Sequence, residues 1–177
     1  MQKQLLLPAL LLAFSAAAAP VELVPDAKGF PKGWRPYGKG PGVVRFYGNV
    51  LRIADESQAN EWGIQRDFAT PAPGKYEFAV EVSGNLSLGQ IVAVVNKKVT
   101  SCKFDTVETN KPIKYYLGVT VPEGCKNVRF LIYGMYQGIP DMKIHSLAFG
   151  PVAKFTQKNL SGKSGAVKPP EPIAISP

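Results

Sequence analysis

The chain has 177 residues, 21 Lys and Arg against 13 Asp and Glu, and a net charge of +8. This length accommodates one domain with a sizeable core, because single domains usually hold about 100–200 residues. One His and two Cys exclude the usual zinc sites built from several such ligands. The basic residues are scattered along the sequence, and if the chain is exported they favour an acidic polysaccharide or envelope surface over nucleic acid.

Residues 1–18 have the pattern of a secretory signal peptide. Lys3 supplies a basic start, and a short apolar run and several small residues follow it. The apolar run, Leu5 to Phe14, is too short to span a bilayer as a helix. Because Pro20 blocks cleavage directly before it, we expect cleavage after Ala18. The sequence therefore predicts a secreted or periplasmic bacterial protein with no membrane span, in a compartment where nucleotide-dependent chemistry is not expected.

The segments from residue 43 onward alternate between short β-type runs and turns rich in Gly and Pro. Clean apolar–polar alternation marks Lys75 to Val82, and an almost wholly apolar run from Leu86 to Val95 predicts a strand buried on both faces. We expect strands over 43–47, 50–53, 62–68, 75–82, 86–95, 115–121, 128–133 and 142–149. This pattern predicts an all-β fold, a β-sandwich of two antiparallel sheets.

Composition also divides the chain after the signal peptide into a folded domain and a tail. We expect the sandwich domain to occupy residues 19–153. Residues 154–177 contain few large apolar side chains and several Pro, Gly, Ser and Lys, so they predict a flexible tail. Cys102 and Cys125 have no metal-type spacing, and in an oxidising compartment an even pair predicts one disulfide bond.

Catalytic motifs are missing from the sequence. The single histidine, His145, lies in the predicted last strand with no Asp or Cys motif beside it. Glu77 and Glu81 share a strand face, but their offset spans about 13 Å, which is too far for a glycosidase pair. We therefore expect no enzymatic activity, with a small hydrolase or lyase as the alternative.

Aromatic and charged side chains on strand faces and loops are the candidate ligand-binding residues. Sugar rings stack on aromatic side chains, while charged and amide groups bind their hydroxyls. Alternation places Tyr116, Arg129 and Tyr133 on outward faces. The candidate ligand residues are Trp62, Arg66, Tyr116, Arg129, Tyr133 and Tyr136, and a second set of loop aromatics comprises Trp34, Tyr37, Tyr47 and Tyr136.

The segment from Trp62 to Phe68 fits two orientations. With Trp62, Ile64 and Phe68 inside, Gln65 and Asp67 face outward, but Arg66 then lies on the core side. In the reverse orientation, Trp62 and Arg66 form an exposed pair suited to stacking on sugar.

Several segments together resemble a known family. Leu23-Val24-Pro25-Asp26 and Gly33-Trp34 resemble the opening of galactose-binding-like jelly-roll modules. Three further stretches are similar to later strands of the same modules, namely Trp62 to Phe68 with Pro73 to Phe78, Lys114 to Gly124, and Ile144 to Leu147. The resemblance covers about residues 23–150 and implies a jelly roll of two antiparallel sheets, often a carbohydrate-binding module attached to a glycoside hydrolase.

Modules of this family usually carry a structural calcium site, so the resemblance poses the question whether this chain has one. Asp26 and Asp141 remain as oxygen ligands, but Met142-Lys143-Ile144 stands where the family's last strand carries acids, so we expect no cofactor. We predict a secreted, non-catalytic glycan-binding module that favours anionic polysaccharide. The alternative is a protein-interaction or cell-envelope architectural module with an exported protein as partner.

Overall fold

The computed structural model of this chain describes residues 18–156 as an all-β structure. The predicted signal peptide, apart from Ala18, and the predicted tail beyond Thr156 lie outside the described residues. Within the part that is described, no helix is long and apolar enough to cross a membrane.

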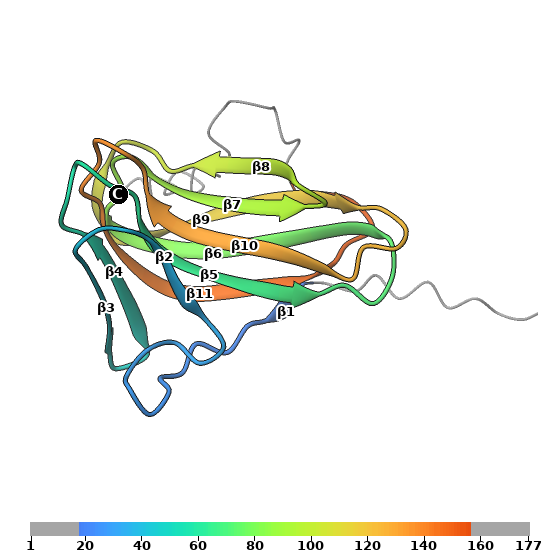
Figure 1. The fold of residues 1–177 in the computed structure, drawn as a ribbon, viewed down its shortest axis with the longest axis horizontal. Coiled ribbons are helices and arrows are strands. Elements are labelled where there is room, and N and C mark those ends of the chain that lie inside the picture. The colour runs from blue at the N-terminus through green and yellow to red at the C-terminus, as the bar shows by residue number, and fades with distance from the viewer. Residues whose placement is uncertain (1–17, 157–177) are drawn as a thin grey trace, which may run out of the picture.

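Two antiparallel sheets form the two layers of the molecule (Figure 1). The six-stranded sheet has the order β3-β4-β11-β6-β9, with β1 paired to β11. Its strands are β1 (Ala19–Pro20), β3 (Gly42–Tyr47), β4 (Val50–Asp55), β6 (Gly74–Asn85), β9 (Glu108–Val121) and β11 (Asp141–Pro151). The five-stranded sheet has the order β2-β5-β10-β7-β8. Its strands are β2 (Arg35–Gly38), β5 (Trp62–Ala69), β7 (Gly89–Val95), β8 (Lys98–Lys103) and β10 (Asn127–Gly134).

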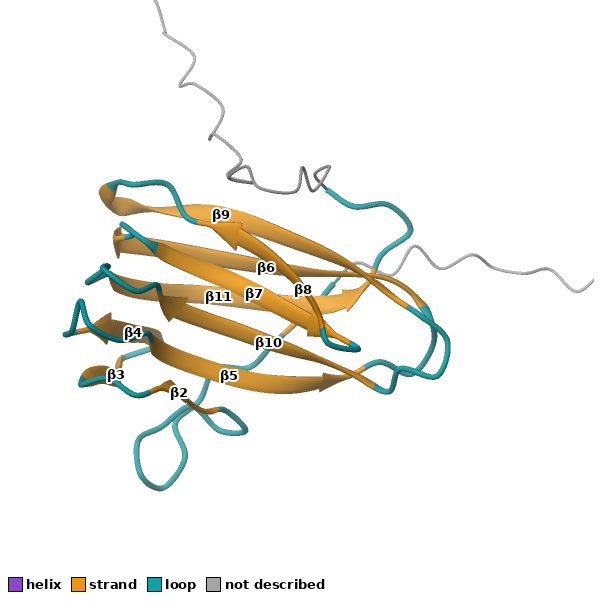
Figure 2. Ribbon diagram, turned by 45° about the horizontal axis from the view of Figure 1, so that its top comes forward, coloured by secondary structure: helices purple, strands orange, loops and turns teal. Residues whose placement is uncertain are grey.

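The connectivity is that of a jelly roll. From β4 to β7, and again from β8 to β11, each connection carries the chain from one sheet to the other. Strands far apart in sequence, such as β4 and β11 or β5 and β10, therefore pair within one sheet. The predicted all-β sandwich is confirmed, and Figure 2 shows its strands joined by loops and turns alone.

The core lies between the two sheets and is formed by the side chains that point inward at every second position of each strand. Phe78 of β6 and Phe130 of β10 are both fully buried, and their rings stack across the sandwich with centroids 3.9 Å apart. Strand β7 is buried along nearly its whole length, as its apolar sequence predicts. Three strands are absent from the sequence prediction. β1 has only two residues, and β2 and β8 are largely exposed edge strands whose polar residues weaken the apolar signal.

The predicted disulfide is wrong, because Cys102 and Cys125 are not bonded to each other. Cys102 on β8 aligns with Ile91, which in turn aligns with Ile132 on β10. Cys125 precedes Ile132 by seven positions, so the two cysteines stand on the order of 20 Å apart along the strands at about 3.3 Å per residue. A disulfide needs Cα atoms within about 7 Å. Cys125 Sγ instead donates a hydrogen bond to the Asn127 carbonyl oxygen.

The start of the predicted tail lies against the six-stranded sheet. The ring of Phe155 occupies the space above Gly118, where an added Cβ would lie 2.4 Å from it. The backbone N–H and the hydroxyl of Thr156 both donate to the buried carboxylate of Glu77, at 2.7 and 2.6 Å. Contacts with the sandwich therefore extend at least to Thr156.

Candidate functional site

The outward side of the five-stranded sheet combines aromatic, amide and charged side chains, and strand register sets their positions. In one row, Tyr37, Gly63, Tyr133, Gln90 and Lys103 lie side by side across the five strands. The next row is Arg35, Gln65, Leu131, Val92 and Ser101, and the third comprises Asp67, Arg129, Val94 and Val99. We call these three rows the tyrosine face.

A pair of tyrosine rings dominates the first row. The centroids of Tyr37 and Tyr133 are 4.8 Å apart, with the ring planes tilted by 56°. Gly63 separates these two residues in the row, and a Cβ on it would lie 2.4 Å from Tyr133 Cβ and 2.1 Å from the Ile132 carbonyl oxygen. The rings therefore meet above a position that only glycine can occupy.

Buried or half-buried polar groups hold both phenols. Tyr37 OH donates to Glu61 Oε2 at 2.9 Å, and Tyr133 OH accepts from the Gln90 amide. Burial and the neighbouring Glu61 raise the pKa of Tyr37 and that of Tyr133 above the ordinary phenol value. Both phenols therefore stay protonated at neutral pH, with their orientations set before any ligand binds.

A bridged ion pair borders the third row. The two carboxylate oxygens of Asp67 accept from Arg35 and from Arg129, each at 2.9 Å. Partial burial acts to raise the pKa of Asp67, but the hydrogen bonds from Arg129 and Arg35 outweigh it and the pKa is lowered. About half of each arginine side chain is exposed, so unused guanidinium N–H groups face solvent.

Apolar side chains fill the space between the tyrosine pair and the ion pair. Leu131, Val92 and Tyr133 form a buried cluster against which Tyr37, Val94 and Met135 pack. The partly buried Tyr37, Val94 and Met135 are the apolar side chains that remain accessible here, and with the half-exposed guanidinium groups nearby they can contact the apolar face and the polar edge of a ring-shaped ligand. The tyrosine face carries no His or Cys in the rows defined above.

The structure separates the predicted ligand residues. Arg129 and Tyr133 share the tyrosine face, and Tyr136 lies in the loop after β10 with 59% of its surface exposed. Tyr116 lies on β9 of the other sheet, opposite Ala79.

Trp62 and Arg66 are on the inward side of β5, so the exposed-pair orientation is wrong. The Trp62 ring packs on Gly42, where an added Cβ would lie 1.9 Å from it. Arg66 lies over the Phe68 ring, 4.9 Å from its centroid, and this contact holds the guanidinium at the edge of the core. Gln65 consequently faces outward beside Arg35.

Two residues of the tyrosine face, Tyr37 and Gln90, and the neighbouring Glu61 are not among the six predicted ligand residues. Tyr37 was placed only in the second aromatic set, and Glu61 and Gln90 in neither. Gln90 is the only amide in the predicted strand Leu86 to Val95, which is the one local signal of a polar contact on that strand.

The carboxylates of the two aspartates considered as calcium ligands, Asp26 and Asp141, already accept hydrogen bonds from other groups. Both carboxylate oxygens of Asp141 accept from Arg52, and Asp26 Oδ1 accepts from the backbone N–H groups of Lys28 and Phe30. Across residues 18–156, no group of three or more His, Cys, Asp or Glu side chains is placed to hold a metal ion together. The residues present do not fit the calcium site that the resemblance implied.

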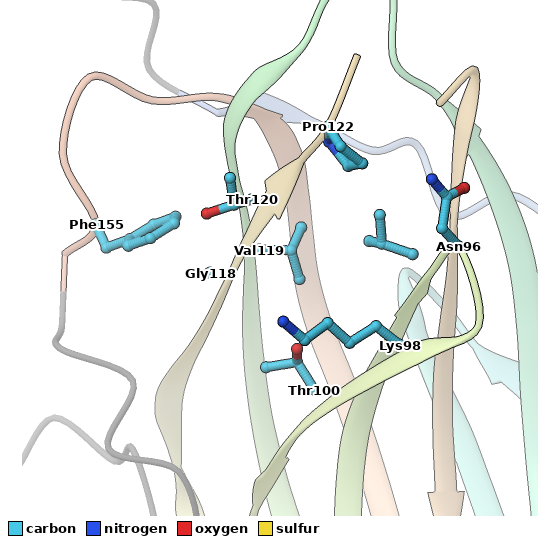
Figure 3. Close-up of a pocket in the computed structure, with 9 residues that line it drawn as sticks. Asn96, Lys98, Thr100, Gly118, Val119, Thr120, Pro122 and Phe155 are labelled. Carbon is cyan, nitrogen blue, oxygen red and sulfur yellow. The ribbon is translucent and has the colours of Figure 1, made fainter. Parts of the chain in front are cut away.

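A separate cavity of about 500 Å³ opens between the edge strands β8 and β9 (Figure 3). Figure 3 shows Lys98 and Thr100 on one side and Val119 and Thr120 on the other, with Phe155 at the margin. Phe155 is its only aromatic lining residue among the described residues and Asn96 its only amide, so the cavity lacks the paired rings of the tyrosine face.

Comparison with known proteins finds solved structures with a similar fold but no match by sequence. No protein-family model and no curated protein matches the sequence. The enzymatically active domain of tailspike protein 4 from bacteriophage CBA120 is similar, with a TM-score of 0.52 at 9% identity. The alignment covers 67% of this chain but only 19% of the tailspike chain.

Carbohydrate-binding modules are also among the similar solved structures. A family 61 module in complex with β-1,4-galactotriose has a TM-score of 0.49 at 13% identity, covering 70% of this chain and 92% of that one. A family 29 module has a TM-score of 0.46 at 16% identity, covering 77% and 91%. At these identities the similarities concern the fold alone.

Proposed function

We propose that this protein is an exported, non-catalytic glycan-binding module that holds its ligand on the tyrosine face. The observation that carries the proposal is the Tyr37–Tyr133 ring pair above Gly63. Tyr133 is buried and Tyr37 only partly so, so the Tyr37 ring supplies the apolar surface, on a face that also carries the half-exposed guanidinium of Arg129. Sugars are complementary to this arrangement, because their apolar ring faces can stack on an aromatic ring while their hydroxyl groups bind polar side chains.

The preformed hydrogen bonds support binding over catalysis. Glu61 is engaged by Tyr37, and Asp67 is engaged by two arginines, so neither carboxylate is placed as a general acid or base. Fixed side chains also lose little conformational entropy when a ligand binds, which favours affinity. The similar solved structures include modules whose names state carbohydrate binding, and the proposal for this chain rests on the tyrosine face itself.

A glycan array with the chain from Ala19 to Pro177 tests the proposal at low and at physiological salt. We expect a related set of glycans to bind, and Tyr37→Ala to weaken that binding about tenfold or more by removing half of the ring pair. Tyr116→Ala is the matched control, because it removes a tyrosine from the opposite sheet. A blank array at both salts with folded protein, or equal losses in the two variants, would contradict the proposal.

A protein-interaction role is the second candidate, and edge strand β8 favours it. Val99 on β8 has 64% of its surface exposed and lies opposite Val94 at the margin of the tyrosine face. An exposed edge strand can pair with a strand of another protein, and the Val99 side chain would pack against that partner. Val99→Lys would then abolish capture of one defined exported protein and leave the glycan array unchanged, whereas glycan binding alone predicts no such partner.

A further inference from the structure

Three basic residues lie side by side on the outward side of the six-stranded sheet, on the opposite side of the sandwich from the tyrosine face. Arg45 on β3 is directly opposite Arg52 on β4, and Arg52 is directly opposite Lys143 on β11. Their neighbours Leu51 and Ile144 are fully buried in the core, so alternation directs all three basic side chains outward. We call these three residues the basic row.

Like charges directly opposite each other destabilise a sheet, and the basic row contains two such pairs. One carboxylate compensates part of this charge. Asp141 accepts two hydrogen bonds from Arg52, at 2.7 and 2.8 Å, and this pairing raises the pKa of Arg52 further. Among the ion pairs of residues 18–156, none involves Arg45 or Lys143. The basic row therefore keeps an excess of positive charge that an anionic ligand would neutralise.

The basic row borders a shallow depression of about 550 Å³. Its lining includes Arg52, Lys143, the exposed ring of Tyr47 and His145. His145 Nε2 lies 2.8 Å from the hydroxyl oxygen of Ser83, which is itself buried, so the imidazole is held in place by the sheet beneath it. The depression thus combines two cations with an accessible aromatic ring and a fixed polar ring, and the Asp141 carboxylate that pairs with Arg52 also lines it.

We propose that the basic row and its depression bind the carboxylate or sulfate groups of an acidic polysaccharide. Neighbouring strands are about 4.8 Å apart, so three cations in one row extend over about 10 Å. That length exceeds a single small anion and suits successive charged groups along a chain. The exposed Tyr47 ring beside the cations adds a surface for a sugar ring. The ligand class rests on the proposed glycan-binding function, but the site is separate from the tyrosine face.

The test compares two double variants with equal net charge. Arg45→Gln with Lys143→Gln removes the two basic-row cations that have no ion pair and leaves Arg52 on Asp141. Lys28→Gln with Lys126→Gln removes two exposed lysines elsewhere and serves as the control. Titration calorimetry with heparin and with polygalacturonate, at low salt and at about 0.15 M salt, measures the affinity.

We expect the basic-row variant to lose about tenfold or more of its affinity for one of the two polymers and to show weaker salt dependence. The control should stay near the unmodified protein. Equal affinity of the two double variants would overturn the proposal, because attraction would then follow net charge alone. Failure of the unmodified protein to bind either polymer would also overturn it.

Two further outcomes separate this site from its alternatives. If inorganic sulfate displaces heparin at the same concentration of sulfate groups, the site binds a small anion and the polysaccharide proposal is wrong. Tyr37→Ala should reduce binding of uncharged array glycans while heparin binding persists. If no uncharged glycan binds but the basic row still binds heparin, only the tyrosine-face function is contradicted. If uncharged glycans bind but the basic-row variant keeps its affinity for both polymers, only the basic-row site is contradicted.

Discussion

Gly63 on β5 lies directly opposite Tyr133 on β10, and the space that a side chain at position 63 would need is filled by Tyr133. The missing side chain lets Tyr37, on the other side of Gly63, reach the Tyr133 ring. The candidate site therefore depends on Gly63, a residue with no side chain that could contact a ligand.

Replacing Gly63 with alanine should disrupt both packing and binding. The added Cβ would lie 2.1 Å from the Ile132 carbonyl oxygen, which belongs to the backbone and has little freedom to move. We expect the free energy of unfolding to fall by about 1–3 kcal/mol, with loss of glycan binding. Urea denaturation measures the first effect. Gly40→Ala is the control, since the nearest atom to its Cβ is 3.5 Å away, and an equal loss there would argue against the packing explanation.

The Tyr133 hydroxyl should contribute to stability through Gln90. Tyr133→Phe keeps the ring but leaves the buried Gln90 amide without this acceptor. We expect a loss of about 1–3 kcal/mol in the free energy of unfolding. Adding Gln90→Leu to Tyr133→Phe should recover part of this loss, because neither polar group is then buried alone. Additive losses in urea denaturation of the single and double variants would contradict this coupling.

Asp67 should stabilise the fold in a pH-dependent way. Because its pKa in the folded protein is lowered, its contribution is complete above the ordinary Asp pKa of about 3.9 and is lost as the pH falls through the lower folded value. Asp67→Asn should therefore cost about 1 kcal/mol or less at pH 7, since Arg35 and Arg129 are half-exposed.

Thermal melts between pH 2 and pH 7 measure this difference. The melting temperatures of the unmodified protein and Asp67→Asn should converge below pH 4. Glu123→Gln, in an exposed turn, controls for the loss of one negative charge. A difference that stays constant over the whole range would show that Asp67 acts through packing instead of charge.

Thr156 should anchor the end of the domain. Its hydroxyl donates to the carboxylate of Glu77, a residue that is only 3% exposed. Thr156→Ala should lower the free energy of unfolding by about 1.5–3 kcal/mol, the range for a hydrogen bond to a charged group. Thr156→Ser retains the donor and should stay close to the unmodified protein in chemical denaturation. Equal destabilisation by both variants would assign the effect to the lost methyl group.

Local alternation was sufficient to predict much of the sandwich. In residues 128–133 the side chains of one face are apolar at every second position, and the structure places Phe130 in the core and Arg129 and Tyr133 on the tyrosine face. Turns rich in Gly and Pro bounded most strands correctly. These features depend on neighbouring residues of one strand, so they can be read from the chain directly.

The sequence by itself therefore determined the fold class, most strand positions and the outward direction of Arg129 and Tyr133. Tertiary structure alone decided which strands are neighbours, and with that the pairing of Tyr37 with Tyr133, the three-strand basic row and the separation of Cys102 from Cys125. It also decided the orientation of Trp62, which depends on space above Gly42 on another strand. The physical reason is that alternation has a period of two residues within a strand, whereas register between distant strands is set by packing across the whole sheet.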